Sequence, residues 1–158
     1  MIDFSALYQK HAPEVFRFAM YLSGNRDQAE DITSETFVRA WTAPESIQMA
    51  TVKGYLLTIA RNLFLQERRK RSRAVPFDEN IRDPHPGPEA ETGKKAEYRA
   101  VMAGLQRLPE IDRAALLMCA FEGMPYAEIA RALGISLPAV KMKIYRSRLA
   151  LSRLEEPQ

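Results

Sequence analysis

Two basic helical segments carry the side chains of this chain that can bind a nucleic acid. From Lys53 to Arg73 there are seven basic residues against one acid, and from Lys141 to Arg153 there are five basic residues and no acid. Lys and Arg at such density neutralise phosphates, and from a helix they can also read guanine edges in the major groove. The first segment by itself is equally compatible with a solvated helix surface. The rest of the chain decides between these interpretations.

Helical periodicity runs through most of the 158-residue chain. Apolar residues recur every three or four positions, which predicts helices over 3–23, 27–41, 51–73, 96–107, 109–121, 126–133 and 137–154, and no strand. Between Val75 and Gly93, four prolines and two glycines without an apolar stripe predict a linker. The sequence therefore predicts an all-α protein of two small helical domains, residues 1–73 and 95–158, joined by a flexible linker at 74–94.

The same periodicity predicts which side chains face the core. In the first helix these include His11, Val15, Ala19 and Leu22, with Phe4, Tyr8 and Phe16 on the same stripe. The predicted core residues of later helices are Ala29, Ile32, Phe37, Ala40, Trp41, Val52, Leu56, Ile59, Ala60, Leu63, Val140, Ile144 and Leu151. The single cysteine, Cys119, lies in an apolar run and is expected to be buried.

Composition excludes several classes of protein. With 46% apolar and 27% charged residues the chain is globular in composition. It has no apolar run of the roughly 20 residues needed to cross a bilayer and no secretory-signal layout, so a cytoplasmic protein without membrane insertion is expected. One cysteine excludes a disulfide framework, and the two histidines form no nucleophile–base or metal pair. We therefore expect neither an enzyme nor a metal or cofactor site.

Charge is distributed unevenly along the chain. Residues 1–50 carry seven acids and four bases, in contrast to the basic segments that follow. Surfaces of both signs in one small protein predict at least two kinds of partner.

Residues 126–148 have the layout of a helix-turn-helix. Gly134 permits a left-handed turn conformation, and Ser136 can cap the helix that follows. That second helix is expected to direct six side chains mostly outward: Lys141, Met142, Lys143, Tyr145, Arg146 and Arg148. Because the second helix of this motif enters the major groove, duplex DNA is the expected ligand.

Together these motifs resemble one bacterial family. The stretch DQAEDITSETFVRAW at 27–41 resembles region 2.2 of the RNA polymerase sigma factors of the extracytoplasmic-function (ECF) type. The segment IARN at 59–62 is similar to the family's region 2.3/2.4 helix, and residues 109–148 to its region 4. The three motifs occur in the family's order and the resemblance covers nearly the whole chain.

The resemblance implies a transcription initiation factor that binds core RNA polymerase and directs it to promoters. By similarity, the helix at 27–41 docks on the clamp helices of the β′ subunit through four acids: Asp27, Glu30, Asp31 and Glu35. The next helix would hold the single-stranded −10 element through Lys53, Tyr55, Arg61, Asn62, Arg68, Arg69 and Arg71. Such a role suits a basic groove with surfaces on which bases can stack.

For the second domain, the resemblance implies recognition of the duplex −35 element. Lys141, Met142, Tyr145 and Arg146 would face bases, while Lys143 and Arg148 would meet phosphates. The resemblance also implies contact with the flap of the polymerase β subunit and regulation by an anti-sigma factor. Tyr55, Gln66 and Met142 depart from the residues common in the family, so no promoter sequence is predicted from it.

Two other functions are compatible with parts of the sequence. A stand-alone helix-turn-helix regulator of duplex DNA would explain the basic C-terminal helix but neither the acidic 27–41 helix nor the basic 51–73 helix. A helical adaptor that never touches DNA would leave both basic segments without a role. Promoter-dependent transcription with core polymerase distinguishes the sigma factor from both.

Overall fold

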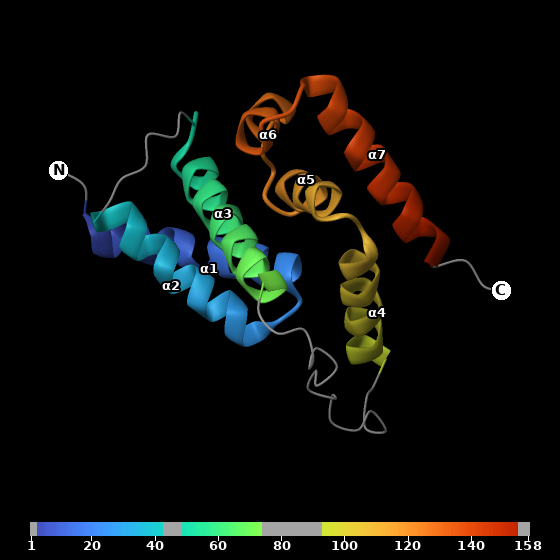
Figure 1. Cartoon of the computed structure of the whole chain (residues 1–158), viewed down its shortest axis with the longest axis horizontal. Coiled ribbons are helices and arrows are strands. Elements are labelled where there is room, and N and C mark those ends of the chain that lie inside the picture. Colours follow the sequence, from blue (N-terminus) through green and yellow to red (C-terminus); the bar gives the residue numbers. More distant parts are fainter. Residues whose placement is uncertain (1–2, 43–48, 74–92, 155–158) are drawn as a thin grey trace.

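The computed structural model describes residues 3–42, 49–73 and 93–154, and within these ranges it consists of seven helices joined by turns (Figure 1). The helices are α1 (Phe4–Ser23), α2 (Arg26–Thr42), α3 (Val52–Arg73), α4 (Gly93–Arg107), α5 (Glu110–Ala120), α6 (Tyr126–Leu133) and α7 (Leu137–Leu154). The predicted all-α class is thus confirmed. Residues 74–92 of the predicted linker lie outside the described residues.

Side-chain caps fix where several helices begin. Asp3 accepts hydrogen bonds from the amides of Ser5 and Ala6 at the start of α1. Asn25 accepts from the Gln28 amide before α2, and Thr51 accepts from the Gly54 amide before α3. These caps satisfy amides that have no partner within their own helix. Short polar residues at those positions therefore set the helix boundaries.

The first three helices form a bundle in which α1 packs against both α2 and α3. The fully buried side chains of this bundle include Val15, Phe18 and Leu22 of α1 and Leu56 of α3. Burying an apolar side chain of this size contributes about 1.5–3 kcal/mol before the loss of chain entropy. The bundle supports α2 and α3 so that each helix keeps one face outward.

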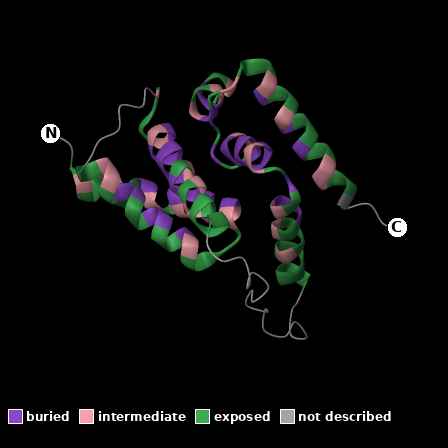
Figure 2. Cartoon of the chain, viewed as in Figure 1, coloured by how far each residue is buried: buried purple, intermediate pink, exposed green. Residues whose placement is uncertain are grey.

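The last four helices build around α5, the most deeply buried helix in Figure 2. Arg113 of α5 is buried and donates to the carbonyls of Leu105 and Leu108 at the end of α4, at 3.3 and 2.9 Å. Its cation meets the carbonyl end of α4, where positive charge is favourable. Burial lowers the pKa of Arg113 below its ordinary value. This residue therefore fixes α4 to the helix-turn-helix unit.

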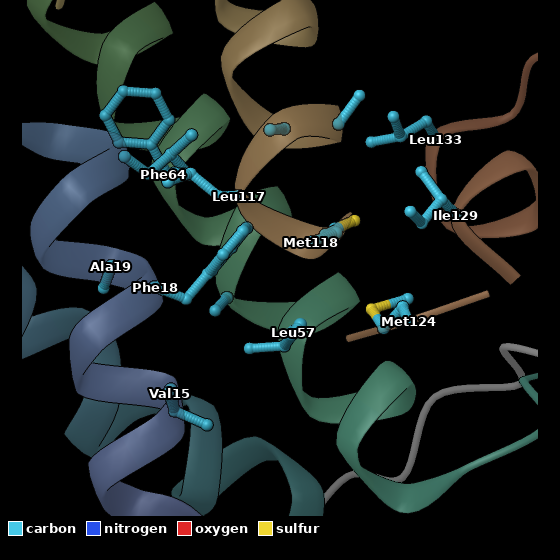
Figure 3. Close-up of a cluster of buried hydrophobic side chains, with 14 of the residues drawn as sticks. Val15, Phe18, Ala19, Leu57, Phe64, Leu117, Met118, Met124, Ile129 and Leu133 are labelled. Carbon is cyan, nitrogen blue, oxygen red and sulfur yellow. The ribbon is translucent and has the colours of Figure 1, made fainter. Parts of the chain in front are cut away.

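The apolar core is continuous between the two groups of helices. Figure 3 shows Phe18 and Leu57 from the first bundle beside Leu117, Met118 and Met124 from the second part of the chain. Helix α1 packs against α4 and α5, and α3 packs against α6. The two predicted helical units therefore lie against each other with a shared apolar interface.

The predicted core was wrong at several positions. Val52 and Trp41, both expected inside, are 48% and 59% exposed. Leu57 and Phe64 are buried instead, because α3 has a second covered face against the C-terminal helices. Cys119 is only partly buried, with its Sγ 3.9 Å from Nη2 of Arg148. Among the described helices, none is both long and apolar enough to cross a membrane.

Candidate polymerase and nucleic-acid interfaces

All four predicted docking acids lie on one exposed face of α2. Asp27, Asp31 and Glu35 follow one another at four-residue spacing, and Glu30 lies beside them. Within the part of the chain that the structure describes, Glu30 pairs with Arg26 and Glu35 with Arg39 on the same helix, each at 3.3 Å. Exposed pairs of this kind contribute little to stability. The acids therefore remain available to a partner.

The same face of α2 continues into an apolar patch. Val38 is 50% exposed and Trp41 is 59% exposed, one turn and two turns beyond the acids. The Trp41 ring lies against Phe4, with centroids 4.5 Å apart, so its position is fixed although it is exposed. Charges beside a positioned indole are typical of the binding surfaces that proteins use for other proteins. Sequence periodicity placed Trp41 in the core, but Phe37, one turn earlier, occupies the buried position.

Helix α3 divides the predicted −10 residues between two faces. With about 100° per residue, Tyr55, Asn62 and Arg69 share one side, whereas Lys53, Arg61 and Arg68 share another. The first side forms a groove of about 190 Å³ lined by Arg39, Ile59, Asn62, Leu65, Gln66 and Arg69. The groove combines two guanidinium groups with two amide side chains. These groups can bind a phosphate and the edge of a base.

The second side of α3 faces the C-terminal helices. Arg61 donates from Nε and Nη2 to the two carboxylate oxygens of Glu110, both at 2.7 Å, and both side chains are about nine-tenths buried. Lys53 donates to the carbonyl of Glu122 at 2.7 Å. The positively charged ends of Lys53 and Arg61 are therefore engaged within the chain.

Further along α3, the basic end is more exposed. The guanidinium of Arg68 lies 5.7 Å from the centroid of the Phe64 ring, and Arg71 pairs with Glu67 at 3.6 Å. Arg68, Arg69 and Arg71 are all exposed. Loose local pairing of this kind is compatible with phosphate binding, but it does not position the side chains for base recognition.

Two other acids of the C-terminal half contact the first bundle. Glu122 accepts two hydrogen bonds from Arg17 of α1, at 3.0 and 2.9 Å, with its own side chain fully buried. This bonding raises the pKa of Arg17 above its ordinary value, although partial burial opposes the change. Glu128 accepts from the backbone amide and the hydroxyl of Thr51, at 3.0 and 2.8 Å. It thereby adds an anion to the N-terminus of α3.

A smaller network surrounds Lys53. Its ammonium lies 3.5 Å from Glu14, whose other oxygen is 2.8 Å from Nδ1 of His11. Burial alone would raise the pKa of Glu14, but the hydrogen bond with His11 and the charge of Lys53 outweigh it. The pKa of Glu14 therefore lies below its ordinary value, and the carboxylate stays charged beside Lys53.

Helices α6 and α7 form the predicted helix-turn-helix. Gly134 adopts φ 69°, and the Ser136 hydroxyl accepts from the Ala139 amide at 3.2 Å, as the sequence predicts. Val140 and Ile144 are buried, which directs the opposite side of α7 outward. That exposed face carries Lys141, Met142, Tyr145, Arg148 and Leu149. Leu149, next to Arg148 in the sequence, is also exposed on this face and was not expected there.

Two of the predicted −35 residues are held by a buried acid. Asp112 of α5 is 4% exposed and lies 3.2 Å from Nη2 of Arg146 and 3.7 Å from Nζ of Lys143. Arg146 remains about half exposed, whereas Lys143 is mostly covered. Asp112 thus positions both cations at the edge of the exposed face. Its role could not be anticipated from sequence, since Asp112 and Arg146 are 34 residues apart.

Two family models match most of this chain. Residues 7–74 match the family model for sigma-70 region 2, and residues 98–151 match that for sigma-70 region 4. The chain therefore contains two regions of the sigma-70 proteins, region 2 and region 4. Together with the relatives below, these matches show that the chain belongs to the ECF family of RNA polymerase sigma factors.

Relatives match over almost the whole chain. The ECF sigma factor SigE of Mycolicibacterium smegmatis is 37% identical over 96% of this chain, which spans only 61% of that relative's length. The ECF sigma factor EcfG of Rhodopseudomonas palustris is 33% identical to this chain. The match covers 90% of this chain and 79% of the length of EcfG.

Two solved structures share the fold. The sigma factor RpoE of Bartonella quintana, in complex with the anti-sigma factor NepR, has a TM-score of 0.78 and 27% identity, with 96% of each chain covered. CnrH in complex with the cytosolic domain of CnrY has a TM-score of 0.71 at 24% identity, covering 96% of this chain and 86% of that one.

Proposed function

We propose that this protein is a cytoplasmic, non-enzymatic initiation factor that brings core RNA polymerase to promoters with specific −10 and −35 elements. Residues 1–73 would act as region 2, residues 74–94 as a linker, and residues 95–158 as region 4. The observation that carries the proposal is the presence of three exposed recognition faces in one chain: acidic on α2, basic and amide-rich on α3, and basic and aromatic on α7.

The α2 face would dock on the β′ clamp helices. Asp27, Glu30, Asp31 and Glu35 supply the charge, and Val38 with Trp41 supplies apolar area beside them. Charged groups around an apolar anchor favour fast and specific association. An equivalent acidic face has no use in a protein that binds only DNA.

The open face of α3 would hold the non-template strand of the −10 element. Asn62, Gln66 and Arg69, together with Arg39 of α2, form a groove that can take one nucleotide. An amide side chain can recognise a base edge, while the arginines meet the backbone. Polymerase would supply all of the chemistry of RNA synthesis.

The exposed face of α7 would read the −35 duplex. Tyr145 and Met142, 62% and 55% exposed, can make apolar contact with bases, and Lys141 and Arg148 lie on either side of them. Arg146, positioned by Asp112, is the best-placed candidate for a guanine. The apolar surface of region 4 would contribute to binding the β flap.

An anti-sigma factor is the expected regulatory partner. The related RpoE of B. quintana, at 27% identity, forms a complex with the anti-sigma factor NepR. Exposed apolar side chains on both halves of this chain, including Trp41 and Tyr145, provide surface for a partner of that type.

Reconstitution with core polymerase tests this function. On a library of promoter fragments, the wild-type protein should direct initiation at a defined subset, and a variant carrying lysine at Glu30 and Asp31 should not. A stand-alone duplex-binding regulator would instead bind DNA tightly by itself and leave polymerase without any promoter.

A further inference from the structure

The outward face of α7 carries a stripe of apolar side chains. Met142, Tyr145 and Leu149 are 55%, 62% and 39% exposed, and they follow one another at spacings of three and four residues. Side chains at these spacings lie on one side of a helix. The stripe is bordered by exposed cations: Lys141, Arg146 and Arg148. Such a face suits a ligand that offers apolar groups between anionic borders, as the major groove of DNA does between its two phosphate chains.

Contacts on the other side of α7 fix this stripe outward. Val140 and Ile144 are buried in the core. Ser147 is fully buried, and its hydroxyl lies 3.3 Å from the carbonyl oxygen of Asp112 in α5. Rotation of α7 about its axis would remove these three residues from the core. Met142 therefore stays exposed in the folded protein, and its apolar surface is available to a ligand.

Duplex DNA offers one apolar group to such a face. Base pairs display hydrogen-bond donors and acceptors in the major groove, and among the four standard bases only thymine adds an apolar group there, its C5-methyl. Met142 has no hydrogen-bond donor and only a weakly accepting sulfur. Its contact with the polar edge of another base would leave donors or acceptors of that base unpaired. Thymine is therefore the base that Met142 can bind favourably.

The position of Met142 in α7 places it among the residues that reach base edges. In a helix-turn-helix, the N-terminal part of the second helix contacts the bases, and Met142 lies in the second turn of α7, which begins at Leu137. Tyr145 follows three residues later, a rise of about 4.5 Å that is close to the roughly 3.4 Å between successive base pairs. The two side chains therefore face neighbouring base pairs. Tyr145 also has a hydroxyl that can hydrogen-bond to a base, so Met142 is the more restrictive residue.

We propose that Met142 is a specificity-determining residue of the −35 contact and selects a thymine through its C5-methyl group. Tyr145 packs on the neighbouring base pair, and Arg146 contacts a guanine edge from the position that Asp112 gives it. Arg148 binds phosphate and adds affinity that is independent of sequence. The proposal rests on the proposed sigma-factor function, in which α7 meets a −35 duplex.

The methyl group can be removed from the DNA without changing the hydrogen bonds of the base pair. Deoxyuridine pairs with adenine as thymidine does, but it lacks the C5-methyl. Burial of one such group corresponds to about a fourfold change in affinity. Replacing the thymine beside Met142 by deoxyuridine should therefore weaken binding about fourfold, and this loss should depend on the side chain at position 142.

Two variants separate the apolar contact from the length of the side chain. Met142→Gln keeps an unbranched chain of similar length but ends it in a polar amide. Met142→Leu keeps an apolar side chain. Met, Leu and Gln have similar helix propensities, so α7 should form equally well in both variants. Arg148→Ala is the matched control, because it removes a phosphate contact at an exposed position of the same helix.

The experiment uses holoenzyme made from core polymerase and the 158-residue chain. Wild-type holoenzyme first selects promoters from a library of random duplexes, and each thymine of the selected −35 element is then replaced singly by deoxyuridine. Competition binding measures the affinity of each duplex. At one thymine, wild type and Met142→Leu should bind the deoxyuridine duplex about fourfold more weakly, while Met142→Gln should bind both duplexes equally. Arg148→Ala should lower the affinity for both duplexes by the same factor.

Three results would overturn the role of Met142. They are a selected element without thymine, no loss at any thymine with the wild-type protein, and an equal loss with wild type and Met142→Gln. Each of these leaves promoter selection intact and so counts against the thymine contact alone. Selection of no promoter by the wild-type holoenzyme would instead count against the proposed function, and against the thymine contact with it.

Discussion

Arg61 of α3 and Glu110 of α5 form a bidentate ion pair across the interface between the two halves of the protein, with both hydrogen bonds at 2.7 Å. Both side chains are about nine-tenths buried. Arg61 is a residue that the family resemblance assigns to −10 DNA, yet here it serves an internal contact. In this arrangement the guanidinium of Arg61 is covered by Glu110.

Charge reversal on α2 should weaken binding to core polymerase. Replacing Glu30 and Asp31 by lysine places positive charge on an exposed face, so we expect affinity to fall by roughly tenfold or more with the fold unchanged. Titration of labelled protein with core polymerase measures the affinity, and circular dichroism checks the helices. Glu97→Lys, an exposed acid on α4, is the control. Equal affinity of both proteins would remove the α2 acids from the docking surface.

Trp41→Ala should reduce polymerase affinity more than it reduces stability. The ring is 59% exposed and contacts Phe4, so its loss should change the free energy of unfolding by only about 1 kcal/mol. An aromatic anchor at an interface typically contributes more, about 2 kcal/mol of binding. Tyr98→Ala, at 43% exposed on α4, provides a comparison. If Trp41→Ala unfolds the protein without a separate binding defect, the ring has a structural role only.

Asn62→Ala should impair promoter opening while leaving −35 binding intact. Asn62 lines the α3 groove, where loss of one hydrogen bond to a base is expected to cost about 0.5–1.5 kcal/mol. Permanganate reactivity of unpaired thymines follows opening, and footprinting of the upstream duplex follows −35 binding. Arg69→Ala should behave similarly but with less dependence on base identity, because arginine here meets phosphate. Lys94→Ala, exposed on α4, controls for general charge loss. A selective −35 defect would place the groove outside the −10 contact.

Asp112→Asn should weaken −35 recognition although Asp112 is buried and cannot touch DNA. Its carboxylate positions Arg146, so losing this charge-assisted contact should cost about 1.5 kcal/mol, or roughly tenfold in affinity. Arg146→Ala itself should lose −35 base discrimination without affecting −10 opening. In the Arg146→Ala background, Asp112→Asn should have little further effect on DNA affinity. Fully additive effects would mean that Asp112 acts through overall stability rather than through Arg146.

Much of the fold could be predicted because helical periodicity is local. The bounds predicted for 126–133 and 137–154 match α6 and α7, and the cap at Ser136 formed as expected. The predicted acidic face of α2 is likewise set by spacing within one helix. Those features need no knowledge of distant residues.

The remaining features depend on contacts between residues far apart in the chain. The apolar stripe of α3 could not reveal that Leu57 and Phe64 also become buried, since the covering side chains come from the C-terminal helices. Arg61 and Lys53 look like free cations in the sequence, but their partners are 49 and 69 residues away. Val52 and Trp41 satisfy the helical period and yet lie at the ends of their helices, where the bundle no longer covers them.

The central claim is that this protein directs core polymerase to specific promoters. The most direct test is to transcribe genomic fragments with core polymerase and this protein and to sequence the run-off transcripts. The account predicts start sites that share two upstream motifs, with the −35 preference relaxed by Arg146→Ala and the −10 preference relaxed by Asn62→Ala. Absence of specific initiation, together with tight binding of the protein alone to duplex DNA, would contradict it.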